Sequence, residues 1–85
     1  MATRKGTDEL QTGDIVLNYG MRIRVNEIHT YESHNGQEMT TVYWSTGDIL
    51  NYDDVKDDDL FRGLFDGSKT WRIQGNHYAH WFVEN

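Results

Sequence analysis

Apolar and polar residues alternate in short runs along most of this chain. In the clearest run, Met21, Ile23 and Val25 share one face, while Arg22 and Arg24 take the other. A two-residue period is typical of half-buried β-strands, and the runs are rich in Val, Ile, Thr, Tyr and Trp, which favour strands. The pattern predicts five or six strands, within residues 15–19, 21–31, 38–45, 48–52, 69–74 and 78–83.

Turn-forming residues separate these runs. Asn35-Gly36 between two alternating segments is the strongest hairpin signal, because both residues accept the positive φ of a type I′ turn. Thr46-Gly47 and Gly75-Asn76 predict two more tight turns. After Val25 the apolar period slips by one residue, which predicts a bulge or bend in a strand that continues to Tyr31.

The middle and the N-terminus of the chain have other patterns. Apolar residues in the segment 60–65 recur at a helical spacing, so we expect one short helix there, with Asp58 or Asp59 as its N-cap. Residues 1–11 are polar apart from Leu10 and predict a flexible N-terminal arm. Residues 12–85 then form a single small domain.

Composition sets how this domain can be stabilised. The chain has 85 residues and no cysteine, so its core must form without disulfide bonds or thiolate zinc sites. Contiguous short hairpins of this size close into a small barrel or a pair of packed sheets. We therefore expect an all-β fold, a five- to six-stranded barrel of the Src-homology-3-like type with at most one short helix.

Aromatic residues supply much of the apolar surface, with three Trp, five Tyr and three Phe. A barrel of this size cannot bury all of them, so alternation decides which side chains face outward. It predicts that Trp44, Trp71 and Trp81 point into the core. The opposite faces of the same strands carry Tyr43, Tyr78 and Phe82.

Several functional classes are excluded by composition. No apolar run approaches the roughly 20 residues that a membrane-spanning helix needs, and the first residues lack the apolar stretch of a secretory signal. We therefore expect a cytoplasmic protein with no membrane partner. The net charge of −6 argues against a general nucleic-acid binder, since phosphate binding requires clustered Lys and Arg.

The sequence carries no motif for catalysis or for a cofactor. It lacks a nucleophile elbow, a phosphate-binding loop and a Cys-His pair. His77 and His80 would lie on opposite faces of a strand, whereas His29 and His34 flank the predicted hairpin tip, where they can approach each other. No convergent set of ligands is evident. We expect a non-enzymatic protein with no catalytic residues, no metal site and no cofactor.

The most distinctive feature is an acidic segment, because residues 48–66 contain seven aspartates and only two basic residues. Such a patch can steer a basic protein partner toward the domain, or it can simply be a solvated loop that keeps the domain soluble. We expect the steering residues to be Asp53, Asp54, Asp57, Asp58 and Asp59. Phe61, Tyr43 and Tyr78 are the expected apolar anchors.

Two other classes of function remain open at this stage. The first is a nucleic-acid-linked regulator, either a mimic of phosphates through its aspartates or a weak binder through Arg22, Arg24 and Arg72. The second is a homo-oligomer, structural or small-molecule-binding, because strands at the edge of a sheet can pair between subunits.

Several segments resemble a set of small proteins encoded by bacteriophages of actinobacteria. The resemblance covers most of residues 12–84 and is carried by Gly-Asp-Ile-Val-Leu near the start and by Trp-Arg-Ile-Gln-Gly-Asn-His-Tyr-Ala-His-Trp-Phe-Val-Glu at residues 71–84. These relatives are accessory proteins that act inside the infected host. The resemblance implies a phage-encoded protein in the host cytoplasm, and it brings no catalytic residues with it. The partner expected for the acidic segment and the exposed aromatics is then a host protein or a second copy of the chain.

Overall fold

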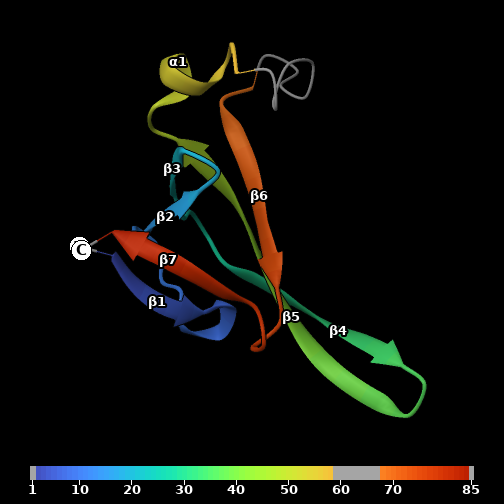
Figure 1. Ribbon diagram of the computed structural model, residues 1–85. Helices are drawn as coiled ribbons and strands as arrows, with labels where there is room; N and C mark the ends of the chain where they lie inside the picture. Colours follow the sequence, from blue (N-terminus) through green and yellow to red (C-terminus); the bar gives the residue numbers. More distant parts are fainter. Residues whose placement is uncertain (1, 59–67, 85) are drawn as a thin grey trace.

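A computed structural model describes residues 2–58 and 68–84 of the chain. Seven strands form one antiparallel sheet that curls around its core, accompanied by a short 3₁₀ turn and one short helix (Figure 1). The predicted all-β, barrel-like fold with a single short helix is confirmed. In chain order, the elements are β1 (Ala2–Gly6), η1 (Thr7–Glu9), β2 (Ile15–Asn18), β3 (Met21–Arg24), β4 (His29–Asn35), β5 (Glu38–Ile49), α1 (Tyr52–Val55), β6 (Thr70–Gly75) and β7 (His80–Glu84).

The long strand β5 connects the two halves of the sheet. The strands follow the order β1-β7-β2-β3-β5-β4, and β6 pairs with β5 off this path. Residues 38–44 of β5 pair with β4, whereas residues 43–48 pair with β6 on the opposite edge of the strand. Hairpin β4–β5 therefore projects beyond the rest of the sheet (Figure 1). The hairpin forms where the Asn35-Gly36 signal predicts it, but its two-residue loop is Gly36-Gln37, because Asn35 still pairs with Glu38. Gly36 has a φ of 67°, whereas Asn35 has no positive φ, so the type I′ turn expected at Asn35-Gly36 is wrong by one residue.

The core lies on the concave face of the sheet. Its members come from β2, β3, β5, α1, β6 and β7 and from the segments that follow η1 and β3: Leu10, Val16, Met21, Ile23, Val25, Ile49, Val55, Ile73 and Val83. Trp71 and Trp81 pack against this cluster, which confirms their predicted inward orientation. Phe82, on the other face of β7, has 58% of its surface exposed, also as expected. Burial of this apolar surface is the main stabilising contribution to such a small domain.

Trp44 contradicts the prediction that all three tryptophans face the core. Buried Ser45 and its partner Ile73 define the inner face of β5 and β6, so alternation turns Trp44 outward and Tyr43 inward. Outside, the ring of His29 stacks on the Trp44 indole at 4.5 Å, and the Arg72 guanidinium lies 4.3 Å from its centre. Alternation shows which residues of a strand share a face but not which of its two faces meets the core, and in β5 the face that carries the small polar Ser45 is the buried one.

The N-terminal residues are not a flexible arm, which corrects the boundary predicted at residue 11. Strand β1 pairs with β7 over five residues, from Ala2 opposite Glu84 to Gly6 opposite His80. Thr7 is buried, and its hydroxyl donates to the Ala79 carbonyl over 3.0 Å while accepting the Trp81 Nε1–H at 2.9 Å. Polar composition misled the prediction because the backbone groups of a strand can pair whatever its side chains are.

A second correction concerns Thr46-Gly47, which lies inside β5 and does not form a turn. A Cβ at Gly47 would collide with the side chain of Ile23 and would lie 3.0 Å from the Arg24 carbonyl oxygen. Glycine is needed here for the close approach of β3 to β5 rather than for its conformational freedom. The strand expected at residues 48–52 is accordingly divided between the end of β5 and the start of α1.

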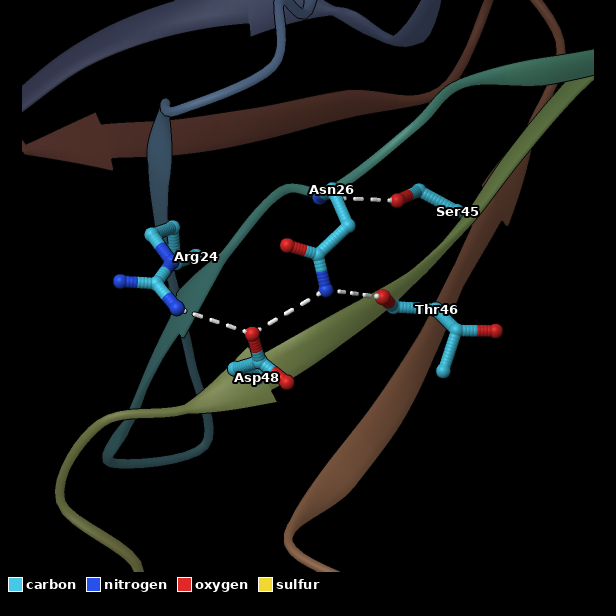
Figure 2. Close-up of polar contacts among 5 residues, drawn as sticks. All are labelled: Arg24, Asn26, Ser45, Thr46 and Asp48. Carbon is cyan, nitrogen blue, oxygen red and sulfur yellow. Dashed lines mark hydrogen bonds and ion pairs between the residues drawn. The ribbon is translucent and has the colours of Figure 1, made fainter.

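The predicted bend after Val25 is a complete break between β3 and β4, and Asn26 stabilises it (Figure 2). Its backbone N–H donates to the Ser45 hydroxyl over 3.1 Å. Its side-chain amide donates to the Thr46 carbonyl over 2.8 Å and to the Asp48 carboxylate over 3.2 Å. Backbone groups that lose their strand partners at a break must find others, and the neighbouring strand supplies them.

The helix expected over residues 60–65 lies outside the described residues. Within residues 2–58 and 68–84, no helix is both long and apolar enough to cross a membrane.

Candidate binding groove

A groove of about 520 Å³ lies beside the projecting part of β5. One wall is the first half of β5, and the other combines η1 with the turn between β6 and β7. The residues that line it are Asp8, Glu38, Met39, Thr40, Thr41, Tyr43, His77 and Tyr78. Two of the three aromatic anchors expected from the sequence, Tyr43 and Tyr78, thus lie in one groove although 35 positions separate them in the chain.

The groove exists because β6 stops short of the first five residues of β5. The final pair between these strands is Tyr43 with Gly75. A Cβ at Gly75 would lie 2.8 Å from the Ala79 Cβ and 2.9 Å from the Thr7 hydroxyl, so the chain is closely packed at this point. It then leaves the edge of β5 and enters the turn that leads to β7. Residues 38–42 of β5 therefore keep β4 as a partner on one edge, and no other described strand pairs with them on the other.

The turn that forms the second wall is held by Asn76. Its side-chain carbonyl accepts the Tyr78 N–H at 2.9 Å, and its backbone carbonyl accepts the Ala79 N–H at 3.1 Å. His77 and Tyr78 place their ring centres 3.9 Å apart. Such local hydrogen bonds fix the backbone of a turn, so the two rings are presented to the groove on a defined scaffold.

The surface of the groove combines exposed apolar groups with negative charge. Tyr78 is 74% exposed and Met39 is 62% exposed, whereas Tyr43 is half-buried at the floor. Two carboxylates, Asp8 and Glu38, are also exposed, and the lining includes no lysine or arginine. Tyrosine and methionine are both enriched at protein interfaces. Tyrosine brings a large contact area at modest cost in side-chain entropy, and methionine adapts its shape to the partner.

The acidic segment lies elsewhere on the molecule. Helix α1 lies at the end of the sheet opposite the β4–β5 hairpin (Figure 1). Asp53, Asp54, Asp57 and Asp58 are exposed there, and Lys56 lies 3.7 Å from the Asp53 carboxylate. Asp59 and Phe61 lie outside the described residues. Among the described residues, the expected steering aspartates therefore lie apart from the groove that contains the two tyrosines.

The three arginines expected for nucleic-acid binding are occupied by neighbours. Two N–H groups of Arg22 donate to the two Glu84 carboxylate oxygens at 2.8 and 2.7 Å. These hydrogen bonds lower the pKa of Glu84 and raise that of Arg22. Arg24 donates to Asp48 over 3.0 Å, and the hydrogen bonds from Arg24 and Asn26 lower the pKa of Asp48 (Figure 2).

Arg72, the third of these arginines, lies over the outer face of Trp44 and donates to the Gln74 side chain over 2.7 Å. The three guanidinium groups are thus engaged within the domain rather than presented as one basic surface.

The histidines form no metal-binding cluster in the described part of the chain. His29 and His34 both belong to β4, so the expectation that they approach each other across the hairpin tip was wrong. Their odd and even positions place them on opposite faces of that strand. His77 lies in the β6–β7 turn and His80 begins β7.

Sequence reasoning found Tyr43 and Tyr78 but missed their surroundings. Met39, His77 and Asp8 carry no motif, and only the register of β5 with β6 shows where the open edge begins. No family model, curated protein or solved structure matches this chain.

Proposed function

We propose that this protein is a non-enzymatic binding module whose groove docks a protein partner. The observation that carries the proposal is the convergence of Tyr43, Tyr78 and Met39 along a strand edge with no partner among the described strands. Exposed apolar side chains of this size are costly to leave in water, and association with a partner removes them from it. Backbone groups at the same edge add directional hydrogen bonds.

The acidic segment has a separate role in this proposal. Exposed Asp53, Asp54, Asp57 and Asp58 lie away from the groove, so they act on the rate of association through their field and not through contact. Asp59, which belongs to the same segment, is assigned the same role from the sequence. The resemblance to small actinobacteriophage proteins makes a protein of the bacterial host the partner we propose, bound in the host cytoplasm.

The test is capture of a partner by tagged wild-type protein from actinobacterial lysate, with and without nuclease. We expect one stoichiometric protein that survives nuclease treatment and is lost with Tyr78→Ala. The matched control is Phe82→Ala, which removes an aromatic ring of similar exposure from the outer face of β7. Equal capture by both variants and the wild type would exclude the groove as the docking site.

Nucleic-acid binding has weaker support than protein docking. Arg22 and Arg24 already pair with carboxylates, and freeing either guanidinium would leave Glu84 or Asp48 without its cation. Mimicry of phosphates by the acidic segment is a separate form of this alternative. It predicts that DNA competes with the protein for its captured partner.

A further inference from the structure

We infer that the groove binds an extended, basic segment of its partner as an additional β-strand on the open edge of β5. The inference rests on the proposed function and specifies the mode of binding and the chemistry of the segment. Addition of a strand to a sheet edge is a common way of recognising an extended peptide, in which main-chain hydrogen bonds provide affinity and side-chain contacts provide specificity.

The direction of the backbone groups supports this mode. The N–H of Ile49 donates to the Lys69 carbonyl, on the β6 edge of β5, whereas the N–H of Leu50 donates to Arg22 of β3 on the other edge. The register of β5 with β6 is continuous, so odd-numbered residues of β5 direct their N–H and C=O groups toward the β6 edge. Met39 and Thr41 therefore direct theirs into the groove, beyond the point where β6 ends.

The side chains along this edge select what the segment carries. Tyr43, Thr41 and Met39 occupy the concave face of β5, where an added strand would bring every second side chain against them. Tyr78 faces the same groove from the opposite wall. These contacts suit apolar side chains. Asp8 and Glu38 are acidic groups in the lining of the groove, which includes no lysine or arginine. The groove therefore favours lysine or arginine at the alternate positions of the added segment.

The charge also argues against a second copy of this chain as the occupant. Each copy carries a net charge of −6 and would bring its own Asp8 and Glu38 to the shared edge. Like charges held near one another oppose pairing. The outer edge of β4 is the other exposed edge of the hairpin, but no β4 residue contributes to the groove, so an added strand there would lack the tyrosine contacts.

The first test uses synthetic peptides and wild-type protein labelled with ¹⁵N. The probe is a peptide of alternating lysine and valine, about six residues long to span the open edge. Its acidic counterpart replaces lysine with glutamate. Two further peptides carry N-methyl groups on either the odd or the even amides. We expect the basic peptide to shift the amide signals of Met39 and Thr41 and to protect them from hydrogen exchange, and the acidic peptide to bind at least about tenfold more weakly.

N-methylation distinguishes strand addition from other modes of docking. In an antiparallel or parallel pair only alternate amides face the partner strand, so one methylated peptide should lose about tenfold or more in affinity and the other should bind nearly as the parent does. Equal binding by both methylated peptides would overturn strand addition. Absence of binding by the basic peptide would do the same.

A pair of protein variants tests the same edge from the other side. Thr41→Pro removes the N–H that faces the groove, and proline is tolerated at strand edges where no ladder bond is lost. Thr41→Val retains that N–H and is the matched control, since both variants remove the hydroxyl that donates to Glu32. We expect Thr41→Pro alone to weaken peptide binding. If Thr41→Pro fails to fold, the methylated peptides still decide the question on the wild-type protein.

The outcomes separate this inference from the proposed function. Suppose that capture of the partner is lost with Tyr78→Ala, but that the partner binds Thr41→Pro as strongly as Thr41→Val. This result would support docking in the groove and overturn strand addition. Equal capture of the partner by Tyr78→Ala and the wild type would contradict the proposed function. A concentration-dependent dimer in sedimentation equilibrium that Thr41→Pro abolishes would identify a second copy as the occupant and overturn the basic segment.

Discussion

Tyr43 lies opposite Gly75, and this pair is the last that joins β5 to β6. On the far side of it β5 continues for five more residues toward the hairpin turn, paired only with β4 among the described strands. Close packing of Gly75 against Thr7 and Ala79 ends β6 at this position. The candidate groove is thus a direct consequence of the N-terminal segment, because η1 and the turn it contacts both occupy the space into which β6 would otherwise extend.

Deleting residues 2–10 is expected to destabilise the domain strongly. The deletion removes β1, the buried Thr7 and the buried Leu10, and it leaves the outer edge of β7 unpaired. Loss of the Leu10 side chain alone should lower the free energy of unfolding by about 2–5 kcal/mol. In urea, the midpoint of unfolding should therefore move to a much lower concentration, or the transition should cease to be cooperative. An unchanged midpoint would restore the view that these residues are a dispensable arm.

Thr7→Val is expected to lower the free energy of unfolding by about 1–3 kcal/mol, although it preserves the shape of the side chain. The Trp81 indole N–H would lose its acceptor in a partly buried site. Thr7→Ser retains the hydroxyl and is the control, so it should remain closer to the wild type. Urea denaturation followed by tryptophan fluorescence measures both. Similar losses for the two variants would indicate that the methyl group of Thr7, not its hydroxyl, matters.

Gly47→Ala is expected to destabilise the domain by about 1–3 kcal/mol through steric overlap. The new methyl group would collide with Ile23 and approach the Arg24 carbonyl where β3 meets β5. Thr46→Ala, at the neighbouring exposed position, is the control. Thermal unfolding by circular dichroism is sufficient. A stabilising effect, as expected for alanine in an uncrowded strand, would contradict the close approach of the two strands.

Stability at acid pH should depend on Asp48. Arg24 and Asn26 lower its pKa below the ordinary value of 3.8, so the ionised form is favoured in the folded state. Its contribution is therefore fully present above pH 3.8 and is lost as the pH falls through the folded-state pKa. Because the carboxylate is partly exposed, the contribution is about 0.5 kcal/mol.

The measurement is urea unfolding of wild type and Asp48→Asn between neutral pH and pH 2. The wild type should be the more stable above pH 3.8, and the two curves should converge below it. Arg24→Ala, which removes the partner of Asp48, should likewise be less stable than the wild type above pH 3.8. A difference that stays constant down to the lowest pH would contradict the predicted linkage.

Reversing the charge of Asp57, Asp58 and Asp59 to lysine should slow association with the captured partner and flatten its salt dependence. These aspartates lie away from the groove in sequence, and the described ones are exposed, so dissociation should change little. Stopped-flow or surface-based kinetics at several salt concentrations separates the two rates. Unchanged association would remove the acidic segment from the proposed function.

Local sequence patterns predicted much of the sheet. Alternation in Met21–Arg24 and the turn signal of Asn35-Gly36 act over a few residues, so β3 and the β4–β5 hairpin lie close to their predicted positions, with the loop displaced by one residue. Strand β1 was missed because its stability comes from backbone pairing with β7, more than 70 residues away in the chain. Gly47 was misinterpreted for the same reason, since what requires glycine there is the approach of another strand.

Periodicity, φ preferences and composition were enough to predict the all-β class, the place of the β4–β5 hairpin and the excess of aspartate. The outward orientation predicted from the sequence holds for Tyr78, which is 74% exposed, but is wrong for Tyr43, which lies half-buried on the inner face of β5. Folding is what brings both tyrosines into one groove, turns Trp44 outward and pairs Arg22 and Arg24 with carboxylates. The physical reason is that a strand presents two faces and two edges, and which of them meets solvent depends on partners that are remote in the sequence.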